Sequence, residues 1–149
     1  MRCVVQRVLS AQVYTGNERL ASIQKGLLVL LGVETEDETA DALYCAKKIA
    51  SLRIFPDEQS LMNLSVTDVQ GEVLLVSQFT LYGDCRKGNR PSFVQAARPE
   101  KANALYEQVV QTLLKMGIPV QTGRFQAEMN VSLVNWGPVT ILIDSKKTF

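Results

Sequence analysis

The apolar run at residues 27–33, Leu-Leu-Val-Leu-Leu-Gly-Val, constrains the fold more than any other feature of the chain. Because it contains no polar side chain, neither face of a strand built from it could face water. It is too short to span a bilayer, which takes about 20 apolar residues in a helix. The run therefore predicts a central strand in a sheet that is covered on both faces.

Other segments supply neighbours for this strand. Residues 2–14 alternate and are rich in valine, 15–18 form a turn signal, and 19–24 return, which predicts an N-terminal hairpin. A second buried strand is expected at 72–79. Shorter strands are expected at 53–55, 118–123, 129–134 and 139–144.

Two segments have the periodicity of helices. Residues 37–51 carry one apolar face, and a second helix begins at Pro99, which suits a first turn, and stops at Gly117. The residues expected on the apolar faces are Leu43, Ala46 and Ala50 in the first helix, and Ala102, Leu105, Val109 and Leu113 in the second.

Length and composition agree with one globular domain. The 149 residues are 46% apolar and 21% charged, which is enough for one hydrophobic core. We expect a single α/β domain over residues 1–149, with mixed or antiparallel β-sheets, barrel- or sandwich-like, covered by two helices. With no visible signal peptide and no membrane-spanning run, we expect a cytoplasmic protein without a membrane partner.

The chain contains no histidine, and this restricts its chemistry. The usual Ser-His and Cys-His nucleophile arrangements and all histidine metal ligands are excluded. Three cysteines, Cys3, Cys45 and Cys85, fall short of the four thiolates of a cysteine-only zinc site. We therefore expect no metal and no cofactor. The odd number of cysteines and the absence of a CxxC motif indicate free thiols in a reducing compartment.

The net charge is +1, so the chain lacks a broad basic field for capturing nucleic acid. One local patch stands out, because the loop segment 86–90, Arg-Lys-Gly-Asn-Arg, carries three positive charges. Such a run either holds phosphates or is simply a solvated loop, and the pattern alone leaves both interpretations open.

Polar residues interrupt the apolar pattern at the end of the strand expected at 72–79. Ser77, Gln78 and Thr80 stand where a sheet presents side chains and main-chain N–H groups to ligands. The alternative is an ordinary polar strand end. Ser77, Thr80 and Cys85 are candidate nucleophiles, but none has a histidine to activate it.

A second segment, Asn135-Trp136-Gly137-Pro138, has the composition of a turn between two strands. About 5–6% of X-Pro bonds in folded proteins are cis, so composition alone does not predict the state of the Gly137–Pro138 bond.

Taken in order, these segments resemble the D-aminoacyl-tRNA deacylases over nearly the whole chain. The two diagnostic motifs are Ser-Gln-Phe-Thr-Leu at 77–81 and Gly-Pro-Val-Thr at 137–140. Each motif is weak alone, but their order and coverage are specific. Further segments that match the family are 1–8, 26–33, 48–55, 62–66 and 87–93.

The resemblance implies a homodimer whose substrate is the 3′ end of an aminoacyl-tRNA. It implies hydrolysis of the ester bond of D-aminoacyl-tRNA to free D-amino acid and tRNA, and removal of glycine mischarged on tRNA-Ala. It further implies that the bond between Gly137 and Pro138 is cis. These two residues would reach into the partner's active site, where their main-chain oxygens exclude an L side chain.

The resemblance also assigns a catalytic segment, Ser77, Gln78, Phe79 and Thr80. Main-chain N–H groups near Phe79 and Thr80 would stabilise the oxyanion, and the substrate's own 2′-hydroxyl would help to activate water. Ser77 and Gln78 would position the ribose and the scissile ester. In the alternative interpretation Thr80 is the nucleophile.

Substrate-binding residues are expected at Phe125 and Met129, which would line an adenosine pocket. The chain departs from the family pattern nearby, because Gln126 replaces a frequent glycine. It departs again at Trp136, where the family commonly has aspartate.

Three other functions are compatible with parts of this pattern. One is a related editing enzyme with relaxed chirality, although such relatives carry different residues at 77–79. Another is a non-catalytic module that binds the tRNA end. The third is a structural dimer without a ligand, which the polar break in a buried strand disfavours.

Overall fold

The apolar run forms the centre of the sheet, as predicted. In the computed structural model, which describes residues 1–149, β3 (Gly26–Gly32) lies between β1 (Arg2–Thr15) and β6 (Glu72–Ser77). It pairs antiparallel with β1 and parallel with β6, so the sheet is mixed. Every residue of β3 except Leu30 is buried, which is the burial that an uninterrupted apolar strand requires.

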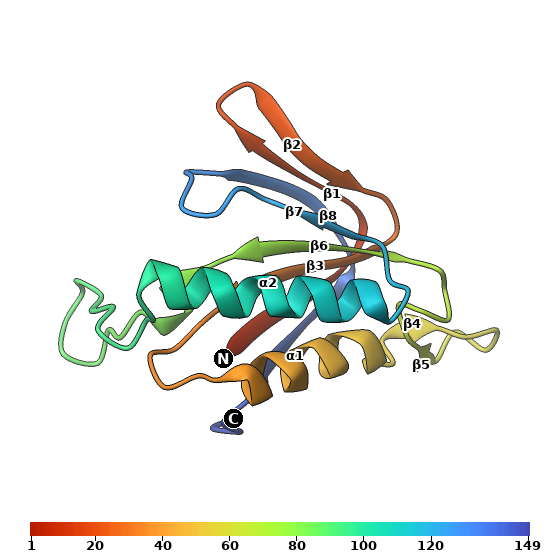
Figure 1. Cartoon of the computed structure of the whole chain (residues 1–149). Helices are drawn as coiled ribbons and strands as arrows, with labels where there is room; N and C mark the ends of the chain where they lie inside the picture. The colour runs from red at the N-terminus through yellow and green to blue at the C-terminus, as the bar shows by residue number, and fades with distance from the viewer.

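The sheet runs in the order β2-β1-β3-β6-β7, and β8 pairs with β1 as well. The first part of β1 pairs with β3 and the last part pairs with β2. Strand β8 pairs with β1 along nearly the whole length of β1. Because β2 also contacts β6 and β7, the sheet curls into a nearly closed barrel (Figure 1). The remaining strands are β2 (Glu18–Ile23), β7 (Val120–Thr122), β8 (Asn130–Asp144), and β4 (Phe55–Pro56) with β5 (Met62–Leu64), which form a small separate sheet.

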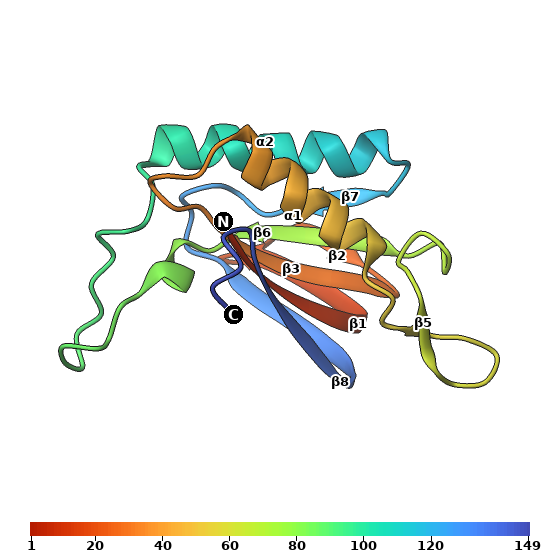
Figure 2. The ribbon, with the colours of Figure 1, turned by 90° about the horizontal axis from the view of Figure 1, so that it is seen from below.

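Two helices, α1 (Thr39–Ser51) and α2 (Pro99–Lys115), cover one face of the sheet (Figure 2). Pro99 occupies the first turn of α2, and Gly117, with φ of +80°, follows its end. Neither helix is long and apolar enough to cross a membrane. The predicted α/β class, with two helices over barrel-like sheets, is confirmed.

The apolar face of α2 is the predicted one, whereas that of α1 was predicted only in part, since Ala46 is buried and Ala50 packs against the core but Leu43 does not. Leu43 was expected to face the core, but its side chain is 40% exposed. The face of α1 that packs on the sheet is rotated away from Leu43, and three of its four buried residues are small. Its buried residues are Ala42, Cys45, Ala46 and Ile49.

Alternate residues of the central strands feed two separate hydrophobic clusters. Val73 and Leu75 of β6 join the large cluster beneath the helices, whereas Leu74 and Val76 join a smaller one on the opposite side of the sheet. Each fully buried aliphatic side chain contributes roughly 1.5–3 kcal/mol of transfer free energy. The strands are therefore held from both sides, and this fixes the strand ends that form the candidate site.

Two expectations about strand ends are wrong. Residues 135–138 do not form a turn between two strands, because β8 is one continuous strand with irregular pairing to β1 around Val8. Residues 136–139 have no partner in β1, and the Asn135 side-chain amide bridges this stretch by accepting from the Val139 N–H (2.7 Å) and donating to the Val139 carbonyl (3.1 Å). Likewise β6 ends at Ser77 rather than at residue 79, and a 3₁₀ turn, η1 (Phe79–Tyr82), follows.

Candidate active site

A cavity of about 630 Å³ lies at the carboxyl end of β6. Ser77, Gln78 and Phe79 line one wall, while Phe125 and Met129 line another. Parallel strands β3 and β6 end at the same edge of the sheet, and such edges are where α/β proteins commonly bind ligands. Five residues proposed from the sequence, from two distant segments of the chain, are thus brought to one cavity.

The backbone at the end of β6 leaves the sheet in a fixed geometry. The Gln78 N–H donates to the Leu31 carbonyl of β3 at 2.7 Å, and the Gln78 carbonyl accepts from Leu81 N–H at 3.2 Å. Gly32 permits this close approach, because a Cβ there would lie 2.9 Å from the Gln78 oxygen. The start of η1 is therefore anchored directly to the central strand.

The N–H groups of Phe79 and Thr80 come first in η1, so they have no preceding carbonyl within the turn to bond. Neither donates to a backbone carbonyl in the turns and loops. Unsatisfied N–H groups at the start of a helical turn attract negative charge on a ligand. Because Phe79 lines the cavity, the start of η1 can stabilise a developing oxyanion there.

Thr80 itself is exposed and does not line the cavity. Its hydroxyl accepts a hydrogen bond from the Gln78 side-chain amide, which is not a base. Cys85 is also exposed and outside the cavity lining. The geometry therefore provides no activated nucleophile at either position.

The cavity floor includes a polar residue that sequence reasoning missed. Tyr106 of α2 donates its hydroxyl to the Leu75 carbonyl at 2.7 Å, and its ring lies 6.2 Å from that of Phe125. Burial raises the pKa of Tyr106 well above its usual range, so the phenol stays neutral. In the sequence, only its position beside the apolar stripe of α2 could have indicated that Tyr106 is buried. Its hydrogen bond to Leu75 holds α2 against β6.

The bond between Gly137 and Pro138 is cis, as predicted. Both residues are exposed, and neither lines the cavity of its own chain. The structure therefore does not bring these two predicted site residues together with Ser77, Gln78 and Phe79.

Arg7, which sequence reasoning also missed, holds the backbone before this bond. Its guanidinium donates to the carbonyls of Trp136 (2.8 Å) and Ile54 (2.6 Å) and lies 4.5 Å from the centre of the Trp136 ring. Burial lowers the pKa of Arg7, but arginine remains charged in proteins. A charge at an inward position of an alternating strand was the signal that could have identified it.

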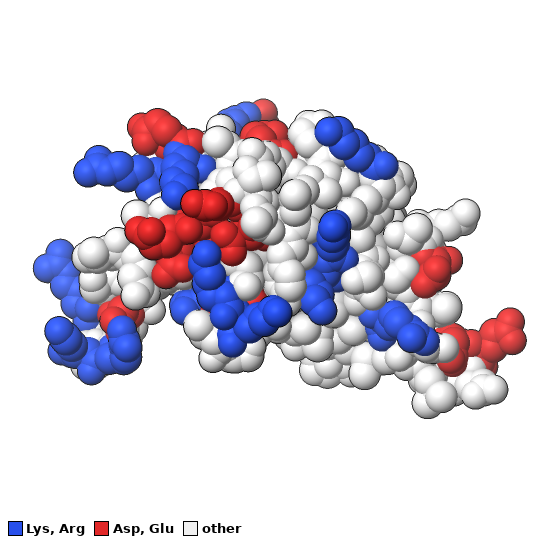
Figure 3. Space-filling view, turned by 60° about the horizontal axis from the view of Figure 1, so that its bottom comes forward, with Lys and Arg blue, Asp and Glu red and all other residues white.

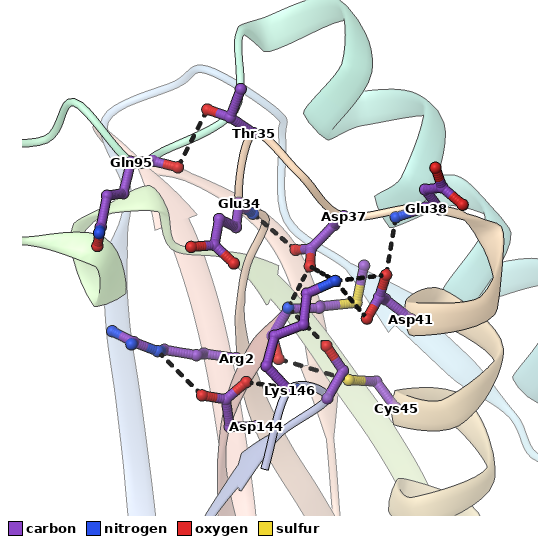
Figure 4. A network of polar contacts seen from close by, with 12 residues as sticks. Arg2, Glu34, Thr35, Asp37, Glu38, Asp41, Cys45, Gln95, Asp144 and Lys146 are labelled. Carbon is purple, nitrogen blue, oxygen red and sulfur yellow. Dashed lines mark hydrogen bonds and ion pairs between the residues drawn. The ribbon is translucent and has the colours of Figure 1, made fainter. Parts of the chain in front are cut away.

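Charge is nearly absent from the cavity. Glu128 is the one charged residue in its lining, and no lysine or arginine contributes to it. A buried ion pair lies instead near the start of α1, where the Met1 ammonium meets Asp37 at 2.6 Å, and the exposed Lys146 meets Asp41 at 3.2 Å beside it (Figure 4). No group of three or more cysteine, aspartate or glutamate side chains is arranged to hold a metal.

The cavity thus suits a ligand with uncharged rings and a polar reactive group at one end. Apolar and aromatic side chains make up most of the lining, whereas Ser77, Gln78 and the start of η1 provide polar groups at the strand end. Such a site can bind a nucleoside and stabilise negative charge on an acyl oxygen.

Comparisons with known proteins agree over almost the whole chain. The family model described as D-Tyr-tRNA(Tyr) deacylase matches residues 4–144. Proteins named D-aminoacyl-tRNA deacylase from Thermotoga petrophila and Koribacter versatilis are 56% and 60% identical over 149 residues, covering all of each chain.

Solved structures give the same fold. A structure named c-Myc DNA Unwinding Element Binding Protein has a TM-score of 0.92 and 41% identity, covering 97% of this chain and 98% of its own. A probable eukaryotic D-amino acid tRNA deacylase has a TM-score of 0.81 and 16% identity, covering 95% and 97%, and supports the fold alone. With a family model and full-length relatives in agreement, the chain belongs to the D-aminoacyl-tRNA deacylase family, a family of hydrolases that act on ester bonds.

Proposed function

We propose that the protein hydrolyses the ester that joins a D-amino acid to the terminal ribose of tRNA, releasing free D-amino acid and tRNA in the cytoplasm. We extend the proposal to glycine mischarged on tRNA-Ala, because glycine lacks the side chain that a chirality filter would exclude. The observation that carries the proposal is the cavity at the end of β6, where polar groups meet an otherwise apolar, ring-lined wall. Family membership supports the reaction class.

In the proposed mechanism main-chain groups, and not an activated side chain, stabilise the charge that develops during the reaction. The N–H groups of Phe79 and Thr80 stabilise the oxyanion that forms when water attacks the ester carbonyl. Ser77 and Gln78 position the ribose and the ester. The 2′-hydroxyl of the substrate helps to activate the water, which is consistent with a chain that contains no histidine.

The adenosine ring is proposed to rest between Phe125 and Met129. Base–aromatic stacking contributes roughly 1–3 kcal/mol per base, so an uncharged wall is sufficient for affinity. Recognition of an RNA end by stacking and by its 2′-hydroxyl does not require a basic pocket.

We assign the chirality filter to the main-chain oxygens of Gly137 and Pro138. Because neither residue lines its own cavity, the filter must act in the cavity of a second copy, and the proposal includes a homodimer. Large apolar side chains that are about half exposed on β1 and β8 support an interface there, namely Leu9 (49%), Val134 (52%) and Leu142 (58%).

A deacylation assay with D-Tyr-tRNA, L-Tyr-tRNA and Gly-tRNA, at substrate in large excess over enzyme, tests the proposal. We expect rapid release of D-tyrosine and glycine and little release of L-tyrosine. Equal hydrolysis of both tyrosyl substrates would indicate an editing enzyme with relaxed chirality. Tight tRNA binding without turnover would indicate a binding module instead.

Mixed dimers test whether the filter acts in the opposite subunit. One dimer joins a wild-type subunit to a subunit with both Phe79→Pro and Pro138→Ala, and the other joins Phe79→Pro to Pro138→Ala. If the filter acts in the opposite subunit, the first dimer loses rejection of L-Tyr-tRNA and the second keeps it. The reverse pattern, or a monomer in solution, would contradict the assignment.

A further inference from the structure

Positive charge is concentrated in one segment beside the cavity. Residues 84–101 contain five basic and two acidic side chains and so carry a net charge of +3, whereas the whole chain carries +1. All five basic side chains are exposed. Figure 3 shows lysine and arginine side chains gathered at the end of the molecule where the loop between η1 and α2 projects.

The first part of this segment emerges directly from the cavity wall. Phe79 and Phe93, which precede and follow the loop, both line the cavity, and their ring centres lie 5.1 Å apart. Asp84 and Ser92 pair through two backbone hydrogen bonds of 2.8 and 2.9 Å. The loop between them, with Arg86, Lys87 and Arg90, therefore begins and ends beside residues that line the cavity.

The second part forms a hollow that adjoins the same cavity. Arg98 and Lys101 line this hollow, whose volume is about 660 Å³, together with Glu100, Thr35 and Val94. Ala96 lines both the hollow and the main cavity, so the two spaces are neighbours. Basic side chains thus stand on two adjoining sides of the opening.

Four of the five cations are free to bind an anion. Arg86 is occupied, because its guanidinium bonds to both Asp84 carboxylate oxygens at 2.9 and 2.6 Å. No carboxylate lies within ion-pair distance of the others, and Lys101 donates only to the Thr35 carbonyl. We name these four residues the cationic rim: Lys87, Arg90, Arg98 and Lys101.

We propose that the cationic rim binds the phosphodiester backbone of the single-stranded RNA 3′ end whose last nucleoside occupies the cavity. The proposal rests on the proposed function. Because the cavity lining holds no cation, the phosphates on the 5′ side of the terminal nucleoside must be neutralised outside it. Lysine and arginine contacts to phosphates position a nucleic acid without reading its sequence, which suits an enzyme acting on the shared end of many tRNAs.

Two substrates with the same ester separate the rim from the cavity. D-Tyr-tRNA carries the phosphates, whereas 3′-O-D-tyrosyl-adenosine has the ester and nucleoside without them. The double variants Lys87→Ala/Arg90→Ala and Arg98→Ala/Lys101→Ala each remove two rim charges. Lys47→Ala/Lys48→Ala removes the same charge from the C-terminal half of α1, at the end of the molecule opposite the loop (Figure 1).

For each rim variant we expect kcat/KM on D-Tyr-tRNA to fall about fivefold to tenfold at low salt. The slope of log kcat/KM against log salt should become shallower by about 1.4, since each contact to a single strand contributes roughly 0.7. Hydrolysis of 3′-O-D-tyrosyl-adenosine should stay within about twofold of wild type, as should both activities of the α1 control.

Equal losses on both substrates, no loss on D-Tyr-tRNA, or equal losses in the α1 control would overturn the proposal. If the wild-type protein hydrolyses neither substrate, the proposed function fails. Binding of a fluorescent RNA oligonucleotide ending in CCA then tests the rim separately. Weaker binding by the rim variants alone would support the rim, and unchanged binding would refute it.

Discussion

The protein holds two polar regions of opposite character. Near the start of α1, the Met1 ammonium and Asp37 are both fully buried and form an ion pair of 2.6 Å, and Lys146 lies 3.7 Å from the same carboxylate (Figure 4). At the end of β6, the uncharged Ser77 closes the strand, and the first N–H groups of η1 have no carbonyl before them in the turn.

The contrast follows from the cost of removing charge from water. A buried ion is tolerated only when it is paired and hydrogen-bonded, so the charges near α1 already bind one another. Neutral donors beside an open cavity can remain unsatisfied until a substrate arrives. Substitutions in the first region should therefore change stability, and substitutions in the second should change catalysis.

The largest expected effect is on stability, from Asp37→Asn. Removing this carboxylate leaves the buried Met1 ammonium without its charged partner and weakens the acceptor for the Glu34 N–H. We expect a loss of about 3–5 kcal/mol in the free energy of unfolding, measured by urea denaturation. Glu107→Gln on the exposed side of α2 is the control and should change it by less than about 0.5 kcal/mol. A loss below about 1 kcal/mol for Asp37→Asn would contradict the expectation that substitutions in the first region change stability.

Next in size is the effect of Phe79→Pro on catalysis. Proline removes the N–H of residue 79 but fits the first position of a helical turn, so we expect kcat to fall about 10²–10³-fold. Phe79 is 57% exposed, and the free energy of unfolding should change by less than about 1 kcal/mol. Phe79→Ala keeps the N–H and is the matched control. If alanine lowers kcat as much as proline does, the ring is required and the N–H is not.

Tyr106→Phe should have an effect of intermediate size, mainly on stability. Tyr106 lines the cavity, but its hydroxyl donates to the Leu75 carbonyl. We expect a loss of about 1 kcal/mol in unfolding free energy and kcat within about twofold of wild type. Since burial raises the folded-state pKa of Tyr106, its contribution to stability is lost as the pH rises above about 10, the value in the unfolded chain. Thermal denaturation above that pH should therefore affect wild type more than Tyr106→Phe, and a fall of kcat by tenfold would place Tyr106 in the chemistry.

The smallest effect is expected from Thr80→Ala. The Thr80 hydroxyl is outside the cavity and bonded to an amide, while its N–H is retained in the variant. Single-turnover deacylation of D-Tyr-tRNA should change by less than about threefold, the size expected from the loss of one exposed hydrogen bond. Complete loss of hydrolysis with intact folding and tRNA binding would restore Thr80 as the nucleophile.

Sequence patterns identified the central strand, both helices and the polar strand end at Ser77. The family resemblance added Phe125 and Met129, which the structure places in the same cavity as Ser77. Arg7 and Tyr106 were not identified from the sequence, because their hydrogen-bond partners lie 129 and 31 residues away in the chain. No local pattern encodes a contact of that separation.

The sequence by itself determined that the strand at 27–33 would be covered on both faces, because a continuous apolar strand has no face that water can solvate. It also determined that histidine would take no part in the chemistry. Only the tertiary structure decided that Gly137 and Pro138 stay inside one continuous strand and outside their own cavity. There the Asn135 side chain bonds to the backbone of β8, which is not paired with β1 at this point. The pairing of the rest of β8 with β1 fixes the place of that strand in the sheet.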